Sequence, residues 1–118
     1  MIVITTQCFS PKIGGIESLM TGMADAMSEV GKDVLVLADG RNTTDDKNKK
    51  YKIKRFSGWK PYRRRRKAIY LKKFIENNNV EAIYADSWKS IEYLKDVNIK
   101  IIVLAHGTEI PKKYFDSF

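Results

Sequence analysis

The sequence predicts an α/β domain built on a parallel β-sheet, and three observations support this fold class. Five short apolar segments of strand length are spread along the 118 residues. Apolar residues at helical spacing separate the first segment from the second, and the third from the fourth. The length is that of one domain with a real core. Strands that alternate with helices are typical of a parallel sheet with flanking helices.

The first predicted unit is a buried strand over residues 1–6, a glycine turn and a helix. The turn is Phe9-Ser10-Pro11-Lys12-Ile13-Gly14-Gly15-Ile16-Glu17. Two adjacent glycines let a ligand approach the backbone, and the amides of a helix N-terminus favour an anion. The turn therefore predicts a site for phosphate or sugar hydroxyls. It is neither a dinucleotide fingerprint nor a P-loop, so a tight turn without a ligand is the alternative. The helix that follows has its apolar positions on one predicted face: Ile16, Leu19, Met20, Met23, Met27 and Val30.

The remaining elements follow from the same patterns. Gly31 is placed to end the first helix. Residues 39–50 are predicted to form a polar loop, and residues 57–62 are predicted to be a break between a strand and the next helix. A helix is predicted over residues 63–78 with Ala68, Leu71, Phe74 and Ile75 inside, and a shorter one over 87–97. The further strands are predicted over residues 33–38, 51–56 (an edge strand with one wet face), 80–85 and 100–105.

The positive charge belongs to one block of the chain. Fourteen basic and no acidic residues lie between Lys47 and Ile75, whereas the remainder has eight basic and fourteen acidic residues. Such a block predicts a surface for an anionic membrane or for nucleic acid, with a merely solvated face as the alternative. Ile69 lies among the outward charges, and Trp59, Tyr62 and Tyr70 interleave with the basic run, as base stacking would require. The predicted anion surface consists of Arg63, Arg64, Arg65, Arg66, Lys67, Lys72 and Lys73.

In this order, the elements resemble the N-terminal domain of a GT-B glycosyltransferase of the large retaining family 4. The glycine turn is similar to the family's Pro-x-x-Gly-Gly-x-Glu segment. Gly31-Lys32-Asp33-Val34-Leu35-Val36-Leu37 is similar to its Gly-His-x-Val-x-Val step, with Lys32 where the family has His. Residues 80–86 resemble the strand that ends at the acceptor cleft, and residues 101–109 resemble the strand that leads into a His-Gly-x-Glu turn. The resemblance covers the chain except for its basic block.

The resemblance implies a Rossmann-like fold and sugar transfer from a nucleotide-sugar to a saccharide or lipid-linked acceptor, in cell-envelope glycan or glycolipid synthesis. His106 matches the histidine that contacts the transferring sugar, and Gly14 and Gly15 face the donor diphosphate. Glu17, Asp86, Gly107 and Glu109 belong to the same implied site. Asp86 could instead cap the helix predicted after it, and Glu17 could simply suit the first turn of a helix.

Other features restrict the class of protein. No metal or resident cofactor is expected, because one His and one Cys are too few for a structural zinc site. The single Cys8 fits a reducing cytoplasm, with the basic block facing the inner side of a membrane. A Cys8–His106 thiolate pair is a rival enzymatic reading, against an inert thiol.

The chain is expected to be a fragment that is inactive alone. The family's second domain, which holds the nucleotide-sugar, is missing, and no Glu has another Glu eight positions on. Tyr114, Phe115 and Phe118 would also lack a later element to cover them.

Overall fold

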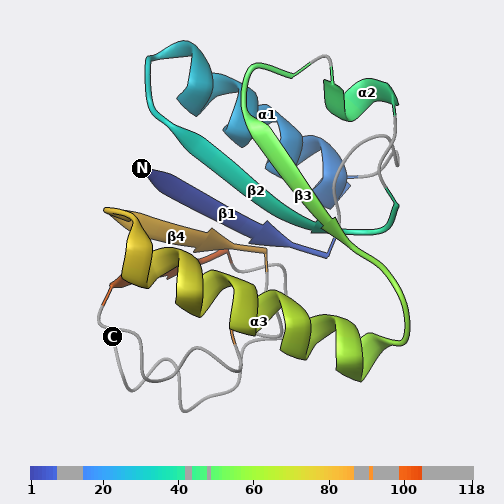
Figure 1. Cartoon of the computed structure of the whole chain (residues 1–118). Helices are drawn as coiled ribbons and strands as arrows, with labels where there is room; N and C mark the ends of the chain where they lie inside the picture. The colour runs from blue at the N-terminus through green and yellow to red at the C-terminus, as the bar shows by residue number, and fades with distance from the viewer. Residues whose placement is uncertain (8–14, 42–43, 48, 87–90, 92–98, 105–118) are drawn as a thin grey trace.

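A parallel five-stranded sheet with helices on both faces forms the protein, as the sequence predicts (Figure 1). The computed structural model describes residues 1–7, 15–41, 44–47, 49–86, 91 and 99–104. The strands are arranged in the order β3-β2-β1-β4-β5, and every neighbouring pair is parallel. The elements are β1 (Ile2–Thr6), α1 (Gly15–Glu29), β2 (Val34–Asp39), α2 (Thr44–Lys47), β3 (Lys52–Phe56), α3 (Lys60–Asn77), β4 (Ala82–Ala85) and β5 (Lys100–Val103).

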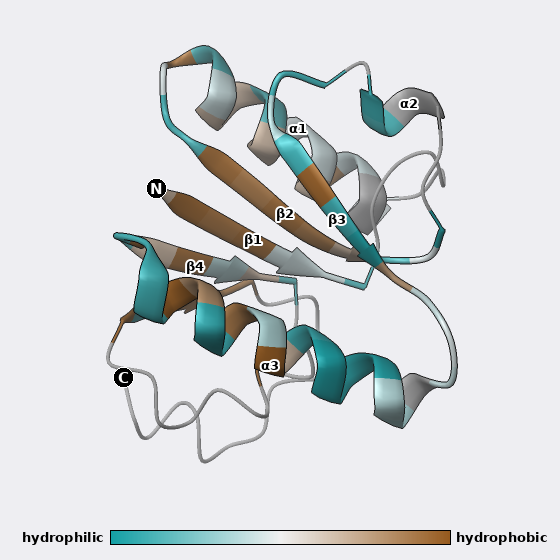
Figure 2. Cartoon of the chain, in the orientation of Figure 1, coloured by the Kyte–Doolittle hydropathy of each residue, from teal (hydrophilic) through white to brown (hydrophobic). Residues whose placement is uncertain are grey.

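The two faces of the sheet carry separate apolar clusters. Side chains alternate between the faces along each strand, so Val3 packs in the cluster that contains Leu71 of α3, whereas Ile4 packs in the cluster with Met20 of α1. The central strands β1 and β2 are almost continuously apolar because both of their faces are buried (Figure 2). The sheet is therefore held from both sides by α1 and α3.

The two principal helices differ from their predictions at particular positions. In α1, Met20 and Ala24 are fully buried, but Leu19 is 47% exposed, and Val30, directly after the helix, is 77% exposed. At about 100° per residue, Leu19 and Val30 lie at the margin of the face centred on Met20. The expectation that they share the buried face is wrong. Gly31 ends the helix as predicted, with φ of 91° and its N–H donating to the carbonyl of Ser28.

Helix α3 begins at Lys60, inside the segment predicted as a break. Pro61 falls in its first turn, where a missing N–H costs nothing. The predicted inner residues Ala68, Leu71, Phe74 and Ile75 do pack against the core. The helix predicted over residues 87–97 lies outside the described residues.

The segment predicted as a loop after β2 contains the short helix α2, which was not predicted. Arg55 of β3 explains its position, because two guanidinium nitrogens donate to the Asp46 carboxylate at 2.8 and 2.9 Å. The Arg55 side chain is only 4% exposed, and the alternation of side chains places it on the face of Tyr51 and Ile53, opposite Lys52 and Lys54. Lys52 and Lys54 of the same strand are exposed, as the alternation predicts.

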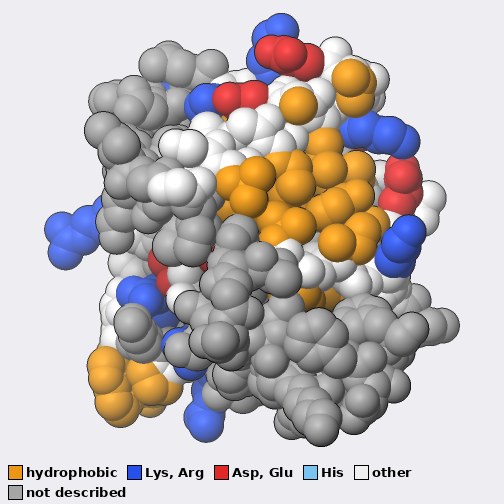
Figure 3. Space-filling view, turned by 180° about the vertical axis from the view of Figure 1, so that it is seen from behind, with side chains coloured by type: hydrophobic (Ala, Val, Ile, Leu, Met, Phe, Trp, Pro, Cys, Tyr) orange, Lys and Arg blue, Asp and Glu red, His pale blue; other side chains and the backbone are white. Residues whose placement is uncertain are grey.

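Helix α1 covers only part of its side of the sheet. Tyr84, Ile102 and Leu104 on this side are half-buried, and hydrophobic side chains gather there at the surface (Figure 3).

Among the described residues, no helix has both the length and the apolar character that crossing a membrane requires.

Candidate functional site

The strand order places a topological switch point between β1 and β4. From β1 the chain proceeds to β2 and β3 on one side, whereas β4 and β5 lie on the other. Connections that leave neighbouring strands in opposite directions open a crevice at the carboxyl ends of those strands, and ligands of open α/β sheets bind there. Thr6, Gln7 and Asp86 lie at this point, where β1 and β4 end (Figure 1).

Asp86 connects the two strand ends. Its Oδ2 accepts a hydrogen bond of 2.9 Å from the Thr6 hydroxyl and one of 2.8 Å from the Gln7 amide. The residue is 4% exposed, so these two bonds stabilise a carboxylate that burial would otherwise disfavour. Asp86 therefore positions the start of the loop that leads from β1 to α1. The alternative role as a cap concerns residues 87–90, which lie outside the described residues.

Three charged residues that the sequence did not predict to meet, Lys67, Arg63 and Asp39, lie beside this point. The Lys67 Nζ is 2.6 Å from Oδ1 of Asp39, at the end of β2, and donates to the Thr6 carbonyl at 3.0 Å. The Nε of Arg63 is 3.1 Å from the other carboxylate oxygen of Asp39. Two side chains of α3 thus hold the helix to the carboxyl ends of β1 and β2.

Burial controls the protonation of this lysine. Desolvation lowers the pKa of Lys67 from its ordinary value, while the charge of Asp39, its hydrogen bond and the charge of Asp86 act in the opposite direction. Asp39 therefore offsets part of the free-energy cost of burying the charge of Lys67, a residue that is only 5% exposed. The arrangement concentrates two carboxylates and two cations at the predicted ligand edge.

The position of Thr5 adds an unsatisfied polar group to the same edge. The residue is completely buried, and its hydroxyl has no hydrogen-bond partner in the described part of the chain. Its neighbours across the sheet are Leu37 and Ala85, both apolar. A buried hydroxyl without a partner is unfavourable, and at a ligand site the ligand can supply the missing partner.

Gly15 is the first residue of α1 and lies at the end of the loop from the switch point. It does not have positive φ, and a Cβ built on it would meet no atom within 4 Å. Neither backbone conformation nor packing within the described part of the chain therefore requires glycine here. The positive φ that would explain a glycine in a tight turn is absent at this position, and among the described residues the backbone here is open to the approach of a ligand.

Most of the other predicted site residues remain predictions. Gly14, His106, Gly107 and Glu109 lie outside the described residues, and so does Cys8. Glu17 lies in the first turn of α1, but its side chain is outside the description. The structure thus places Gly15 and Asp86 near the carboxyl edge of the sheet and leaves the histidine turn untested.

The predicted basic surface is divided by α3. Arg63 and Lys67 were expected at an outward anion surface, and this expectation is wrong because both pair with Asp39 beneath the helix. Arg65, Arg66 and Lys73 are exposed on the opposite side. Arg64 and Lys72 are half-buried.

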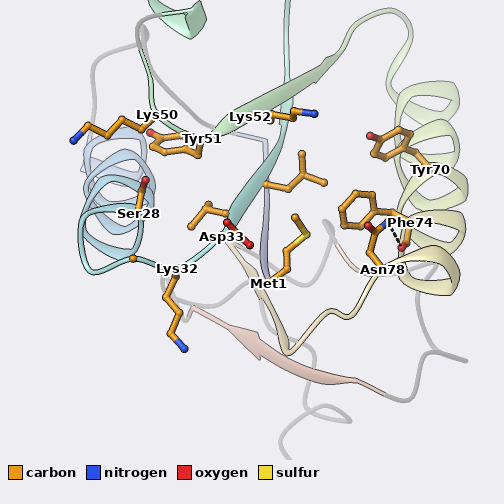
Figure 4. A pocket seen from close by; sticks show the side chains of 13 residues that line it. Met1, Ser28, Lys32, Asp33, Lys50, Tyr51, Lys52, Tyr70, Phe74 and Asn78 are labelled. Atoms are coloured by element: carbon orange, nitrogen blue, oxygen red, sulfur yellow. Dashed lines mark hydrogen bonds between the residues drawn. The ribbon is translucent and has the colours of Figure 1, made fainter.

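A separate pocket of about 610 Å³ opens at the amino-terminal edge of the sheet (Figure 4). Tyr70 and Phe74 project into it from α3, with ring centroids 6.2 Å apart, and Lys52 reaches its rim from β3. The sequence did not predict this pocket. It lies at the opposite end of the strands from Asp86, so it does not belong to the switch-point site.

No family model matches the chain, and no curated protein matches it significantly. In the described part of the chain, no group of three or more His, Cys, Asp and Glu side chains is arranged to hold a metal ion.

Proposed function

We propose that the chain is the N-terminal, acceptor-side part of a GT-B glycosyltransferase of retaining family 4. The reaction moves a sugar from a nucleotide-sugar to a saccharide or lipid-linked acceptor. One observation carries the proposal: α1 begins at the switch point with Gly15, a glycine that neither φ nor packing among the described residues requires. A ligand that must approach the helix N-terminus gives that glycine a role.

The proposed chemistry matches what a helix N-terminus supplies. When the sugar is transferred, the nucleotide diphosphate leaves with increased negative charge. Backbone amides at the start of α1 and the positive end of its dipole stabilise that charge without reorganisation. In this proposal, a Cβ at Gly15 would occupy the path of the diphosphate.

The surrounding residues take supporting roles in this proposal. Asp86, through Thr6 and Gln7, fixes the start of the loop that carries the glycines. The resemblance assigns contact with the transferring sugar to His106, and contacts with substrate to Glu17, Gly107 and Glu109. An imidazole at a strand's carboxyl end can orient a hydroxyl or stabilise partial charge. The donor nucleoside is held by the second domain that the resemblance implies.

The test is an NMR titration of the ¹⁵N-labelled chain with inorganic pyrophosphate and with UDP- and GDP-linked hexoses. We expect shift changes in the amides of Gln7, Gly15 and Asp86, and unchanged amides at the rim of the opposite pocket, such as Lys52. Gly15→Val should abolish these changes. Gly22→Val is the matched control, because Gly22 lies in the same helix, also lacks positive φ and also has open space around its Cβ.

Two outcomes contradict the proposal. One is a wild-type chain whose switch-point amides do not respond to pyrophosphate. The other is a folded Gly15→Val variant that binds these ligands as Gly22→Val does.

A further inference from the structure

The outer side of α3 presents large apolar side chains among cations. Tyr62 and Ile69 are 64% and 56% exposed, and Trp59, directly before the helix, is 72% exposed. Trp59 and Tyr62 are in contact, with ring centroids 6.1 Å apart. Figure 3 shows hydrophobic side chains beside Lys and Arg at the end of the molecule where α3 begins. Exposed aromatic and aliphatic groups this large favour a partner that removes them from water.

Helical geometry brings these groups into one stripe. Positions 62, 65, 66, 69 and 73 recur at intervals of three or four, so they share the outer face of the helix. The opposite face carries Leu71, which is 1% exposed, and the buried Lys67. Packing against the sheet therefore does not use the outer stripe. We call this stripe, together with Trp59, the outer face of α3; its members are Trp59, Tyr62, Arg65, Arg66, Ile69 and Lys73.

The charge on this face is positive over the first four turns of α3, and the exposed Glu76, three residues after Lys73, is the one acidic residue of the helix. No acidic residue occurs from Lys60 to Ile75, and the first turn of α3 has no acid to offset the positive end of the helix dipole. Arg63 and Lys67 share the Asp39 carboxylate beneath the helix. The cations that remain directed outward are Arg65, Arg66 and Lys73, which are all exposed.

We infer that the outer face of α3 binds an anionic lipid bilayer, with the helix lying in the plane of the interface. Trp and Tyr favour the headgroup level, where one part of the ring is apolar and the other wet. Arg65, Arg66 and Lys73 meet lipid phosphates while Ile69 enters the acyl boundary. Nucleic acid would use the same cations and could stack on Trp59. It offers no apolar phase for the aliphatic Ile69, so the bilayer is the better match.

This inference is independent of the proposed function, since it uses only the outer face of α3. The experiment is sedimentation of the whole chain with vesicles of phosphatidylcholine, alone or with about one-third phosphatidylglycerol. We expect binding to the anionic vesicles only, and release when salt rises from about 0.15 to about 0.5 M. The double variant Arg65→Glu/Arg66→Glu should weaken binding roughly thirtyfold or more, because each cation near an anionic surface contributes a several-fold factor.

Two matched controls separate the face from net charge and from general apolarity. The double variant Lys50→Glu/Lys52→Glu changes the net charge by the same amount, at exposed residues beside the pocket of the amino-terminal edge of the sheet. It should retain most of the binding. Ile69→Ser should weaken binding severalfold, whereas Val30→Ser, at the 77% exposed residue that follows α1, should not. Circular dichroism checks that each variant is folded.

Three results would overturn the inference. The first is a chain that leaves anionic vesicles unbound. The second is an equal loss of binding in the two double variants, which would indicate net charge alone. The third is displacement of the chain from vesicles by single-stranded RNA or duplex DNA at about 0.15 M salt, which would make the outer face a nucleic-acid surface.

Discussion

Lys67 of α3 and Asp39 at the end of β2 form an ion pair of 2.6 Å between side chains that are 6% and 10% exposed. The pair joins the helix to the carboxyl edge of the sheet, and Lys67 also donates to the Thr6 carbonyl of the neighbouring strand. A helix with a strongly basic sequence is thus fixed to the core through one of its own charges. This contact also determines which side of α3 remains outward.

Lys67→Met should destabilise the fold by about 3 kcal/mol, because breaking a buried pair leaves a carboxylate without its main partner. Methionine retains most of the side-chain volume, so the loss reports the charge and not a cavity. Urea unfolding measures it, with Arg65→Met as the exposed control, expected within about 0.5 kcal/mol of the wild type. Equal stabilities of the two variants would show that the pair does not anchor α3.

Tyr51→Phe should change how stability depends on alkaline pH. Burial, together with the 2.6 Å hydrogen bond from its hydroxyl to Asp25, raises the pKa of Tyr51 well above its ordinary value. The unfolded tyrosine loses its proton above about pH 10 while the folded one retains it. The stabilisation is therefore complete below that pH and is lost as pH rises above it.

The measurement is the free energy of urea unfolding between about pH 8 and 11, with both proteins at each pH. The Tyr51→Phe variant should be less stable by about 1 kcal/mol at the lower pH, because it lacks the hydrogen bond. The difference from the wild type should shrink as pH rises. A constant difference over the whole range would mean that Tyr51 ionises equally in both states.

Asp86→Ala should loosen the junction between β1 and β4. The substitution leaves the Thr6 hydroxyl and the Gln7 amide without their acceptor, at a cost of about 1–3 kcal/mol. Hydrogen exchange at the Gln7 amide should accelerate more than exchange at Val36 in the middle of β2. Asp86→Asn keeps one oxygen acceptor and should lose less. Unchanged exchange at Gln7 in the alanine variant would refute the positioning role.

Gly15→Ala should leave the fold intact. No atom lies within 4 Å of the added Cβ, so the substitution introduces no clash. At the first residue of α1 the gain from lower unfolded-state entropy is a few tenths of a kcal/mol, and for Gly22→Ala in the helix interior it is about 0.5–1 kcal/mol. Thermal unfolding monitored by circular dichroism checks both. A loss of more than about 1 kcal/mol for Gly15→Ala would assign the glycine a role in folding and remove the argument for a ligand.

The parallel sheet was readable from the sequence because buried parallel strands are continuous apolar runs. Ile2–Thr6 and Val34–Asp39 have this character, and both strands appear within one residue of their predicted bounds. Gly31 marked a helix end for an equally local reason, the positive φ that glycine adopts at low cost. The inner face of α3 followed from the spacing of Leu71 and Phe74. The glycine turn and the terminal histidine turn were also identified locally, but only residues 15–17 of the first lie among the described residues, and none of the second.

Tertiary structure alone determined how the basic block is divided. The sequence contained a signal for Lys67, which precedes Leu71 by four residues and Phe74 by seven and so shares their face. A lysine is nevertheless expected in solvent unless a buried partner is known, and Asp39 is distant in sequence. Parallel pairing of β1 with β2, and the packing of α3 across them, brings that carboxylate beneath the helix. The sequence alone determines how many charges α3 carries. The side of α3 on which each charge lies depends on long-range packing, because burial and pairing set the free energy of a charge.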